Sequence, residues 1–371
     1  MLKPGSTLKA LLAGLCFFGN ASAQIVIGQT SGFTGASEAS VKEGTEGARL
    51  YIDAVNAKGG INGQRIELVS LDDKADNKLA AANARKLITE RGAIALFFTR
   101  GTPQAEAIMP VQEELKVPLV APSTGAMVLH APVKPWIFNV RSTYQREAEK
   151  AVSLLKSIGI TSIAVVHVDD SFGADAMIGA RSGFDEAKLT PVFVAKFDKS
   201  KPDFSKIAAD AARLQPQAMM IFGSGATVAD AVVAVRAAGS RAQIATLSNN
   251  AATGFVKALK GNARGTIVTQ VFPNERSIAS PFVKEALGMA RAKGLVEISP
   301  ATLEGFAAAK VLLEGIRRAG SNPTGEKLRA ALESVRGYNI GGMDVTYSAT
   351  DHTGLDFVDL SIINIDGKFT R

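Results

Sequence analysis

The sequence predicts an α/β protein built on parallel β-sheets. Short apolar runs alternate with segments of helical periodicity over most of the 371 residues, a pattern typical of parallel strands joined by crossover helices. Glycines punctuate this alternation, as in KGGINGQ at residues 58–64, where they can adopt positive φ and stop a helix. With 46% apolar and 21% charged residues, the composition is that of a soluble globular protein of about two domains.

The first half of the chain contains four predicted strands with helices between them. On the first helix, apolar and small residues from Gly47 to Val55 fall on one face. The strands are expected at residues 25–28, 65–71, 94–98 and 117–120, and the helices at residues 41–58, 76–91 and 102–116.

A second alternation of the same kind begins after Ser142. Its strands are expected at residues 162–168, 192–197, 218–222, 244–247 and 266–269, with helices between them, followed by a mainly helical region from residue 280 and by MDVTYS and FVDLSIINI near the end. Two such sets predict two lobes, with a boundary near Arg141. Because no Gly/Ser-rich or Pro-rich linker separates the sets, ordered strands are expected to join them.

The N-terminus has the pattern of a signal peptide that is cleaved after Ala23. Lys3 and Lys9 accompany an apolar run at residues 10–18, and small residues occupy positions 21–23. The apolar run is too short to cross a bilayer, which needs roughly 20 residues, and no other segment predicts a membrane span. The sequence therefore predicts export to the periplasm as a protein without a membrane span of its own.

Composition also excludes several classes of function. The single cysteine, Cys16, lies in the predicted signal peptide behind Leu15, which is bulkier than a lipidation motif usually allows, so the mature chain has no cysteine for disulfides, thiol catalysis or metal binding. Removal of Lys3 and Lys9 takes the formal charge from +7 to +5. Since no basic run or aromatic and basic alternation accompanies this charge, nucleic-acid binding is not expected.

Two strand ends carry polar motifs that suit a ligand. FFTRGTPQ ends an apolar run and presents Arg100 and Thr102, and VAPSTGAM repeats the arrangement with Ser123, Thr124 and Gly125. Open α/β sheets bind ligands at the carboxyl ends of their strands, where helix N-termini present free N–H groups. We expect Thr102 to be an N-cap, followed by Pro103 as the first helical residue.

These groups together suit a carboxylate. Helix ends contribute roughly 0.3 to 2 kcal/mol to anion binding and hydrogen bonds to a charged acceptor about 1.5 to 3 kcal/mol each, whereas a micromolar dissociation constant needs about 8 kcal/mol. No metal or cofactor is therefore required. The alternative is that the hydroxyls and glycines only cap and turn the chain, which is their commonest use.

Four segments in order resemble the periplasmic branched-chain amino-acid binding protein family, the type I solute-binding proteins of ABC transporters. They are GQTSGFTGASEASVKEGTEGARLYIDAVNAKGGINGQRIEL, FTRGTPQAEAIMPVQEELKVPLVAPSTGA, VHVDDSFGADA and GLDFVDLSIINIDGKF. The resemblance covers the whole mature chain. It implies two doubly wound, Rossmann-like lobes joined by three crossing strands, with residues 24–141 and 271–343 in lobe 1 and residues 142–270 and 344–371 in lobe 2.

The resemblance also implies function. Proteins of this kind are monomers that close on a small molecule and deliver it to an inner-membrane ABC permease, without catalysis and without a cofactor. Residues that match Thr102 and Ser123 to Gly125 bind the α-carboxylate of an amino acid in the family, and Arg100 could strengthen that site. Phe172 matches a tyrosine that stacks on the ligand, but it lacks the hydroxyl; core packing is the alternative role.

The second lobe is expected to contribute polar residues to the cleft. These are Ser224 in FGSGAT and Ser248, Asn249 and Asn250 in LSNNAAT, all of which follow predicted strands. Each could equally serve only in a turn.

The two asparagines bear on the class of ligand. Amino-acid binders of the family place an acid near Asn249 and Asn250 to pair with the ligand ammonium, and an ammonium buried without a counter-charge costs several kcal/mol. Unless Asp169, Asp170 or Asp175 reaches the cleft, an aromatic or aliphatic carboxylate without an amine is expected. A branched-chain amino acid is the alternative, and a ligand sensor for a signalling receptor is a further one.

Enzymatic motifs are weak. GSGATVAD follows a predicted strand, but Val228 replaces the third glycine of a dinucleotide fingerprint, so a turn is favoured. The S-x-x-K at Ser153 to Lys156 lies within a predicted helix without its partner motifs.

No metal site is expected either. His130, His167 and His352 lack ligand spacing and do not indicate a zinc site or a Ser-His-Asp triad. The acids at residues 72, 73 and 76 are explained by a solvated loop and by Asp76 as the cap of the next helix.

Overall fold

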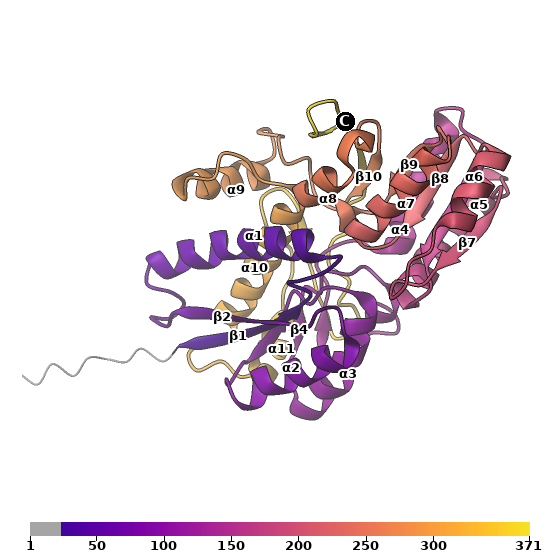
Figure 1. The fold of residues 1–371 in the computed structure, drawn as a ribbon. Helices are drawn as coiled ribbons and strands as arrows, with labels where there is room; N and C mark the ends of the chain where they lie inside the picture. The colour runs from indigo at the N-terminus through magenta and orange to yellow at the C-terminus, as the bar shows by residue number, and fades with distance from the viewer. Residues whose placement is uncertain (1–23) are drawn as a thin grey trace, which may run out of the picture.

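Two mainly parallel β-sheets with helices on their faces make up the computed structural model of the protein, which describes residues 24–371 (Figure 1). The predicted signal peptide lies outside the described residues. Along residues 24–371 no helix is long and apolar enough to cross a membrane.

The first sheet has five parallel strands in the order β2-β1-β3-β4-β5. These are β1 (Ile25–Ser31), β2 (Ile66–Asp72), β3 (Ala95–Phe97), β4 (Leu119–Val120) and β5 (Ile137–Phe138). Because β1 lies between β2 and β3, the strand order reverses beside it, and the carboxyl ends of β1 and β3 form a topological switch point. Ligand sites of open α/β sheets lie at such points.

Helices cover both faces of this sheet. Helix α1 (Glu38–Ala57) packs against α10 (Pro300–Arg318) on one face, and α2 (Asn77–Thr89) packs against α3 (Thr102–Leu115) on the other (Figure 1). Helices α9 (Pro281–Ala292) and α11 (Gly325–Glu333) and the small ribbon of β11 (Tyr338–Asn339) and β12 (Asp344–Val345) complete this side of the molecule.

The second sheet has seven strands in the order β14-β13-β10-β9-β8-β6-β7. They are β6 (Ile163–Val168), β7 (Val194–Phe197), β8 (Ala218–Phe222), β9 (Gln243–Thr246), β10 (Ile267–Gln270), β13 (Asp359–Ile363) and β14 (Phe369–Thr370). Strands β6 to β10 are parallel, whereas β13 and β14 pair in antiparallel fashion. The order reverses beside β6, so the ends of β6 and β8 form a second switch point.

The helices of the second sheet are short or medium in length. They are α4 (Tyr144–Ser157), α5 (Ser171–Ala187), α6 (Ser205–Leu214), α7 (Gly225–Ala237) and α8 (Thr253–Ala258), with 3-10 turns η1 (Met127–Leu129), η2 (Ser248–Asn250) and η3 (Lys260–Asn262). Every residue of β6 and β8 is buried, as expected for strands covered on both faces.

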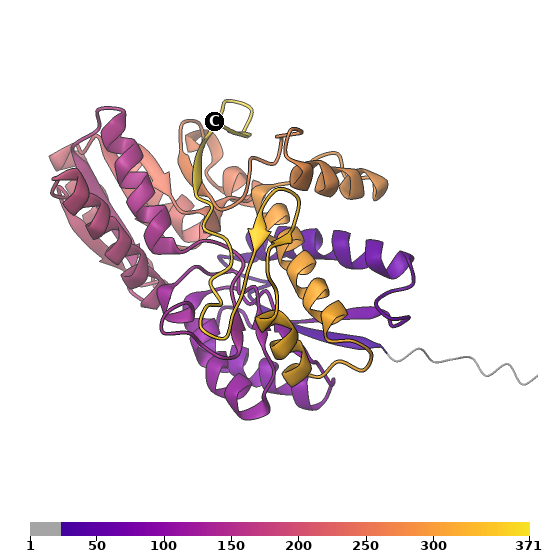
Figure 2. The same ribbon diagram turned by 180° about the vertical axis from the view of Figure 1, so that it is seen from behind.

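The chain passes between the two sheets three times, after β5, after β10 and after β12. Figure 2 shows the last passage as the yellow segment that runs to β13. The apolar core forms separate clusters around the two sheets, and Val345, Tyr347 and Leu355 pack with the cluster of the first sheet. The lobe boundaries at residues 141, 270 and 343 stay a prediction.

Local details confirm some predictions and correct one. Asp76 caps α2, because its side chain accepts a hydrogen bond from the Leu79 N–H at 2.7 Å. The N-cap of α3, however, is Gly101 and not Thr102, which is the first helical residue. The φ of Gly101 is 99°, a value that glycine adopts far more easily than threonine, and this explains why the cap falls one residue earlier.

Candidate functional site: a cavity between the two sheets

A cavity of about 370 Å³ lies where the two switch points face each other. Gly32 and Arg100 line it from the chain that follows β1 and β3, and Asp170 and Ser224 line it from the chain that follows β6 and β8. Its volume is within the range of small-molecule sites, roughly 300 to 1,000 Å³. Both halves of the molecule thus contribute strand ends and helix starts to one cavity.

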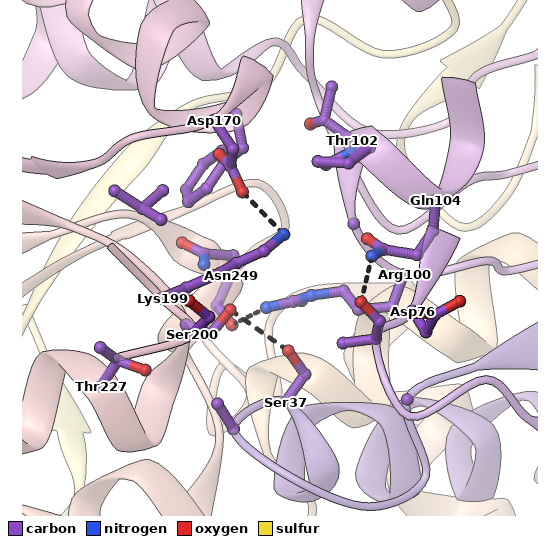
Figure 3. A pocket seen from close by; sticks show the side chains of 18 of the residues that line it. Ser37, Asp76, Arg100, Thr102, Gln104, Asp170, Lys199, Ser200, Thr227 and Asn249 are labelled. Carbon is purple, nitrogen blue, oxygen red and sulfur yellow. Dashed lines mark hydrogen bonds and ion pairs between the residues drawn. The ribbon is translucent and has the colours of Figure 1, made fainter. Parts of the chain in front are cut away.

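Arg100 brings a buried positive charge to this cavity. Its side chain donates from Nη2 to the Asn249 carbonyl oxygen at 2.8 Å, across the gap between the two sheets (Figure 3). Arg100 is 7% exposed, and it forms no ion pair with any acidic side chain of residues 24–371. A guanidinium has five N–H donors, so it retains donors for an anionic ligand.

The loop that follows β2 forms another wall. Lys74, Ala75 and Asp76 line the cavity, and the Ala75 carbonyl accepts a hydrogen bond from Gln104 Nε2 at 2.7 Å. Beneath it, the buried Asp73 carboxylate accepts from the Ala75 N–H at 2.9 Å, and burial raises the pKa of Asp73 to about 6. The loop is therefore held by a carboxyl group that titrates above its ordinary range.

The opposite wall contains an acid and a base. Asp170 caps α5 by accepting from the Gly173 N–H at 3.1 Å, and its other oxygen pairs with Lys199 Nζ at 3.1 Å (Figure 3). Asp170 and Lys199 both line the cavity. Asp169 pairs with Lys196 at 2.9 Å and is not among the lining residues.

An aromatic wall lies beside these charges. The rings of Tyr144 and Phe172 have centroids 4.7 Å apart at an interplanar angle of 56°, and both residues line the cavity with Val168 and Phe197. Phe172 is 8% exposed, so core packing accounts for most of its surface. Such a wall suits the apolar part of a ligand.

The structure brings five of the ten predicted site residues to the cavity. These are Arg100, Thr102, Phe172, Ser224 and Asn249. The other five are Ser123, Thr124, Gly125, Ser248 and Asn250, which do not line it. Ligand contact by any of the ten stays a prediction.

The residues of the second motif are engaged with protein instead. Ser123 donates to Glu304 Oε1 at 2.9 Å, and the Thr124 hydroxyl lies 2.7 Å from that of Thr102. A Cβ at Gly125 would lie 2.5 Å from the Ser142 carbonyl oxygen. Glycine at position 125 therefore allows the close approach of two backbones.

Ser248 belongs to a buried ionic network. Its hydroxyl accepts from Arg141 Nη2 at 2.7 Å, and its N–H donates to Glu147 Oε2 at 2.9 Å. Arg141 also pairs with Glu147 and lies 3.5 Å from Glu304. The network joins the passage after β5 to α4, α10 and η2, so it fixes the loop that carries Asn249.

Further contacts join the two halves around the cavity. The Ser37 hydroxyl donates to that of Ser224 at 3.3 Å, and the Ala226 N–H donates to the Ala36 carbonyl at 3.2 Å. Together with the Arg100 bond, they describe an arrangement in which the two halves are closed on the cavity.

Sequence reasoning missed several lining residues. They are Lys74, Gln104, Tyr144, Phe197 and Lys199, among others. Lys199 follows the predicted strand at residues 192–197, so the strand-end rule could have found it. Tyr144 begins a helix after the passage between the sheets, and no local pattern marks its position.

Metal-binding geometry is not evident in the part of the chain that the structure describes, where no three His, Cys, Asp or Glu side chains form a suitable group. His130, one of the three histidines considered from the sequence, is buried with 4% exposure, and burial lowers its pKa to about 4.

Two facing α/β lobes with a cavity of mixed polar and apolar lining at their switch points define a solute-binding architecture. The profile of the family described as "Periplasmic binding protein" matches residues 24–360, so the chain belongs to the periplasmic binding protein family. Structures of the type I branch have the same arrangement of sheets.

Several relatives support this assignment. A crystal structure of a substrate-binding periplasmic protein from Ralstonia solanacearum is 31% identical with a TM-score of 0.86 and covers 93% of this chain and 99% of its own. The Leu/Ile/Val-binding protein BraC3 of Rhizobium johnstonii is 26% identical over 353 residues, 92% of each chain. A branched-chain amino acid ABC transporter structure from Thermus thermophilus with bound valine is 17% identical, covers 94% of this chain and 95% of its own, and has a TM-score of 0.82, which shows the fold alone.

Proposed function

We propose that this protein is the periplasmic receptor of an ABC importer and that it binds an α-amino acid between its lobes for delivery to an inner-membrane permease. The observation that carries the proposal is Arg100, a guanidinium that is 7% exposed, faces the cavity and has no acidic partner among residues 24–371. Buried charges are normally paired. A ligand carboxylate supplies the missing partner.

An amine is supported by Asp170. The sequence favoured a carboxylate without an amine because no acid accompanies Asn249 and Asn250. That expectation held only if none of three acids, among them Asp170, reached the cleft. Asp170 lines the cavity, where it caps α5 and pairs with Lys199, so an ammonium group would share this carboxylate with Lys199. Names of relatives such as BraC3 point to amino acids as well, so the amino acid becomes the main proposal and the amine-free acid the second candidate.

The proposed cycle involves closure and no chemical step. Hydrogen bonds such as Arg100 to Asn249 and Ser37 to Ser224 join the lobes around the cavity. A ligand that adds contacts to both lobes favours the closed state, because a ligand shifts an equilibrium by its differential affinity for the two states.

The proposal also includes export with cleavage after Ala23, which mass spectrometry of the mature N-terminus would test.

A thermal-shift panel tests the class of ligand. Leucine, isoleucine and valine would be compared with 4-methyl-2-oxopentanoate, which keeps the carboxylate and side chain of leucine but lacks the amine. A ligand at 100 times its dissociation constant adds about 2.7 kcal/mol, which raises Tm by several degrees at roughly 2 to 4 °C per kcal/mol. We expect amino acids to raise Tm and the oxo acid to raise it less. Equal or larger shifts with the oxo acid would favour the amine-free candidate.

A further inference from the structure

A second space adjoins the cavity and has its own polar groups. It measures about 230 Å³ and lies between the start of α1 and the starts of α7 and α8. Ala36 and Asn249 line both spaces, so the two meet at these residues. Most of the remaining lining is small or apolar, including Ala39, Gly225 and Phe255.

Two buried amides in this lining have a fixed orientation. The Nδ2 groups of Asn249 and Asn250 both donate to the Gly223 carbonyl, at 2.9 and 3.1 Å, and Asn250 Nδ2 also donates to Thr246 Oγ1 at 2.8 Å. A carbonyl oxygen can only accept. Neither amide can therefore be turned over without losing these bonds.

The fixed orientation leaves two acceptors without donors. Asn249 Oδ1 and Asn250 Oδ1 are buried and have no hydrogen-bond partner among the described residues. The residues are 3% and 1% exposed. A Cβ placed on Gly225 would lie 3.7 Å from Asn250 Oδ1, which locates that oxygen at the wall of the second space. Buried acceptors of this kind normally have a donor.

We propose that this second space is a subsite for an uncharged N–H donor at the end of the ligand's side chain, such as a carboxamide. The inference rests on the proposed function and deepens it, since the α-carboxylate and amine would occupy the larger cavity beside Arg100 and Asp170. An aliphatic side chain would leave both oxygens unpaired. A cationic side chain would meet the positive charge of Lys42, which lines the space together with Glu38 and pairs with it at 2.6 Å.

The chain offers a variant that fills the subsite without touching its hydrogen bonds. A Cβ at Gly225 would meet its three nearest atoms at 3.6 to 3.7 Å, which is ordinary van der Waals contact. Gly225 is also the first residue of α7, where alanine is a good helix former. Gly288→Ala is the matched control, because a Cβ there has nothing within 4 Å and lies in α9.

Calorimetric titration of the full mature chain with three probes tests the subsite. The probes are L-glutamine, its methyl ketone analogue L-2-amino-5-oxohexanoate, in which a methyl group replaces the amide NH2 so that length and carbonyl are kept, and L-leucine. We expect glutamine to bind at least tenfold more tightly than the ketone, because sites built around buried polar groups strongly reject analogues that lack the matching group. Gly225→Ala should weaken glutamine at least tenfold and change leucine less than threefold, and Gly288→Ala should change neither.

The outcomes separate this inference from the proposed function. If the ketone binds as tightly as glutamine, or Gly225→Ala leaves glutamine unchanged, the subsite is overturned. If leucine binds and glutamine does not, the result supports the receptor function and contradicts the carboxamide subsite. If none of the three amino-acid probes binds to the wild-type chain, the proposed function is contradicted and the subsite with it.

Discussion

The strand-end segments 98–102 and 121–125 look alike in sequence and differ in structure. Both place small polar residues directly after a buried strand. In the first segment, α3 begins at its last residue, Thr102, and both Arg100 and Thr102 line the cavity. In the second, no helix follows within the segment, and its side chains and backbone are engaged by Glu304, Thr102 and the passage after β5.

The difference shows that polar residues at a strand end reach the cavity only where nothing else in the fold occupies the space beside them. Strands β1 and β3 flank the switch point of the first sheet, whereas β4 lies one strand further toward β5. At the end of β4, the space is filled by the ionic network around Arg141. The same residue types thus line the cavity in one segment and contribute to the connection between the lobes in the other.

The largest expected effect concerns the network beside segment 121–125. Glu147→Gln leaves the fully buried Arg141 without its nearest acidic partner, and the loss of one member of a buried ion pair costs about 3 to 5 kcal/mol. Urea unfolding would measure the free energy of unfolding. Glu149→Gln on the same helix is the control and should change it by less than about 0.5 kcal/mol. Equal effects of the two variants would show that the network does not stabilise the fold.

The next effect concerns the pH dependence of the loop beside segment 98–102. Burial raises the pKa of Asp73 from 3.8 to about 6, so between these values the folded state binds more protons than the unfolded state. Stability attributable to this group therefore falls as pH rises from about 4 to 6 and is constant above, with a total of at most about 3 kcal/mol.

Asp73→Asn should remove the decrease in the free energy of unfolding between about pH 4 and 6 that is attributed to Asp73. Unfolding free energies measured at several pH values between 4 and 7 would show a flatter profile for the variant than for the wild-type chain. Superimposable profiles would mean that Asp73 titrates near its ordinary value in the folded protein.

A third effect concerns the ligand. Arg100→Met keeps much of the side chain's length but removes the guanidinium, and a hydrogen bond to a charged group contributes about 1.5 to 3 kcal/mol. The dissociation constant of the best ligand of the thermal-shift panel should therefore rise by tenfold or more in calorimetry. Lys284→Met, on α9 and outside the cavity lining, is the control. Unchanged affinity in Arg100→Met would remove Arg100 from the site.

The smallest effect separates the two threonines that touch. Thr124→Val removes the hydroxyl contact with Thr102 and should lower the free energy of unfolding by about 1 kcal/mol, with ligand affinity within twofold of wild type. Thr102→Val should match it in stability. Because only Thr102 lines the cavity, the affinity of that variant should fall further, and equal affinities of the two variants would contradict the comparison.

Local patterns predicted most of the fold. The alternation of apolar runs and helical segments placed the strands and helices close to their observed positions. Strand β4 has only two of the four residues expected, and the two-residue strand β5 was not predicted. The sharing of each lobe between distant segments came from the family resemblance, because composition and periodicity are local and carry no information on which distant segments pack together.

The lining of the cavity could be predicted for residues that directly follow a strand. Arg100, Thr102, Ser224 and Asn249 follow strands and line the cavity, as the strand-end rule predicts. Ser123 also follows a strand, but its hydroxyl is taken by Glu304, a residue 181 positions later in the chain. No local pattern reveals such a partner.

The most direct test of the central claim is a crystal structure of the protein with the tightest-binding amino acid from the panel. We expect the ligand carboxylate to accept hydrogen bonds from the Arg100 guanidinium inside the cavity, beside Phe172 and Asp170. A carboxylate held by Ser123, Thr124 and Gly125 without Arg100, or a ligand bound outside the cavity, would contradict the account.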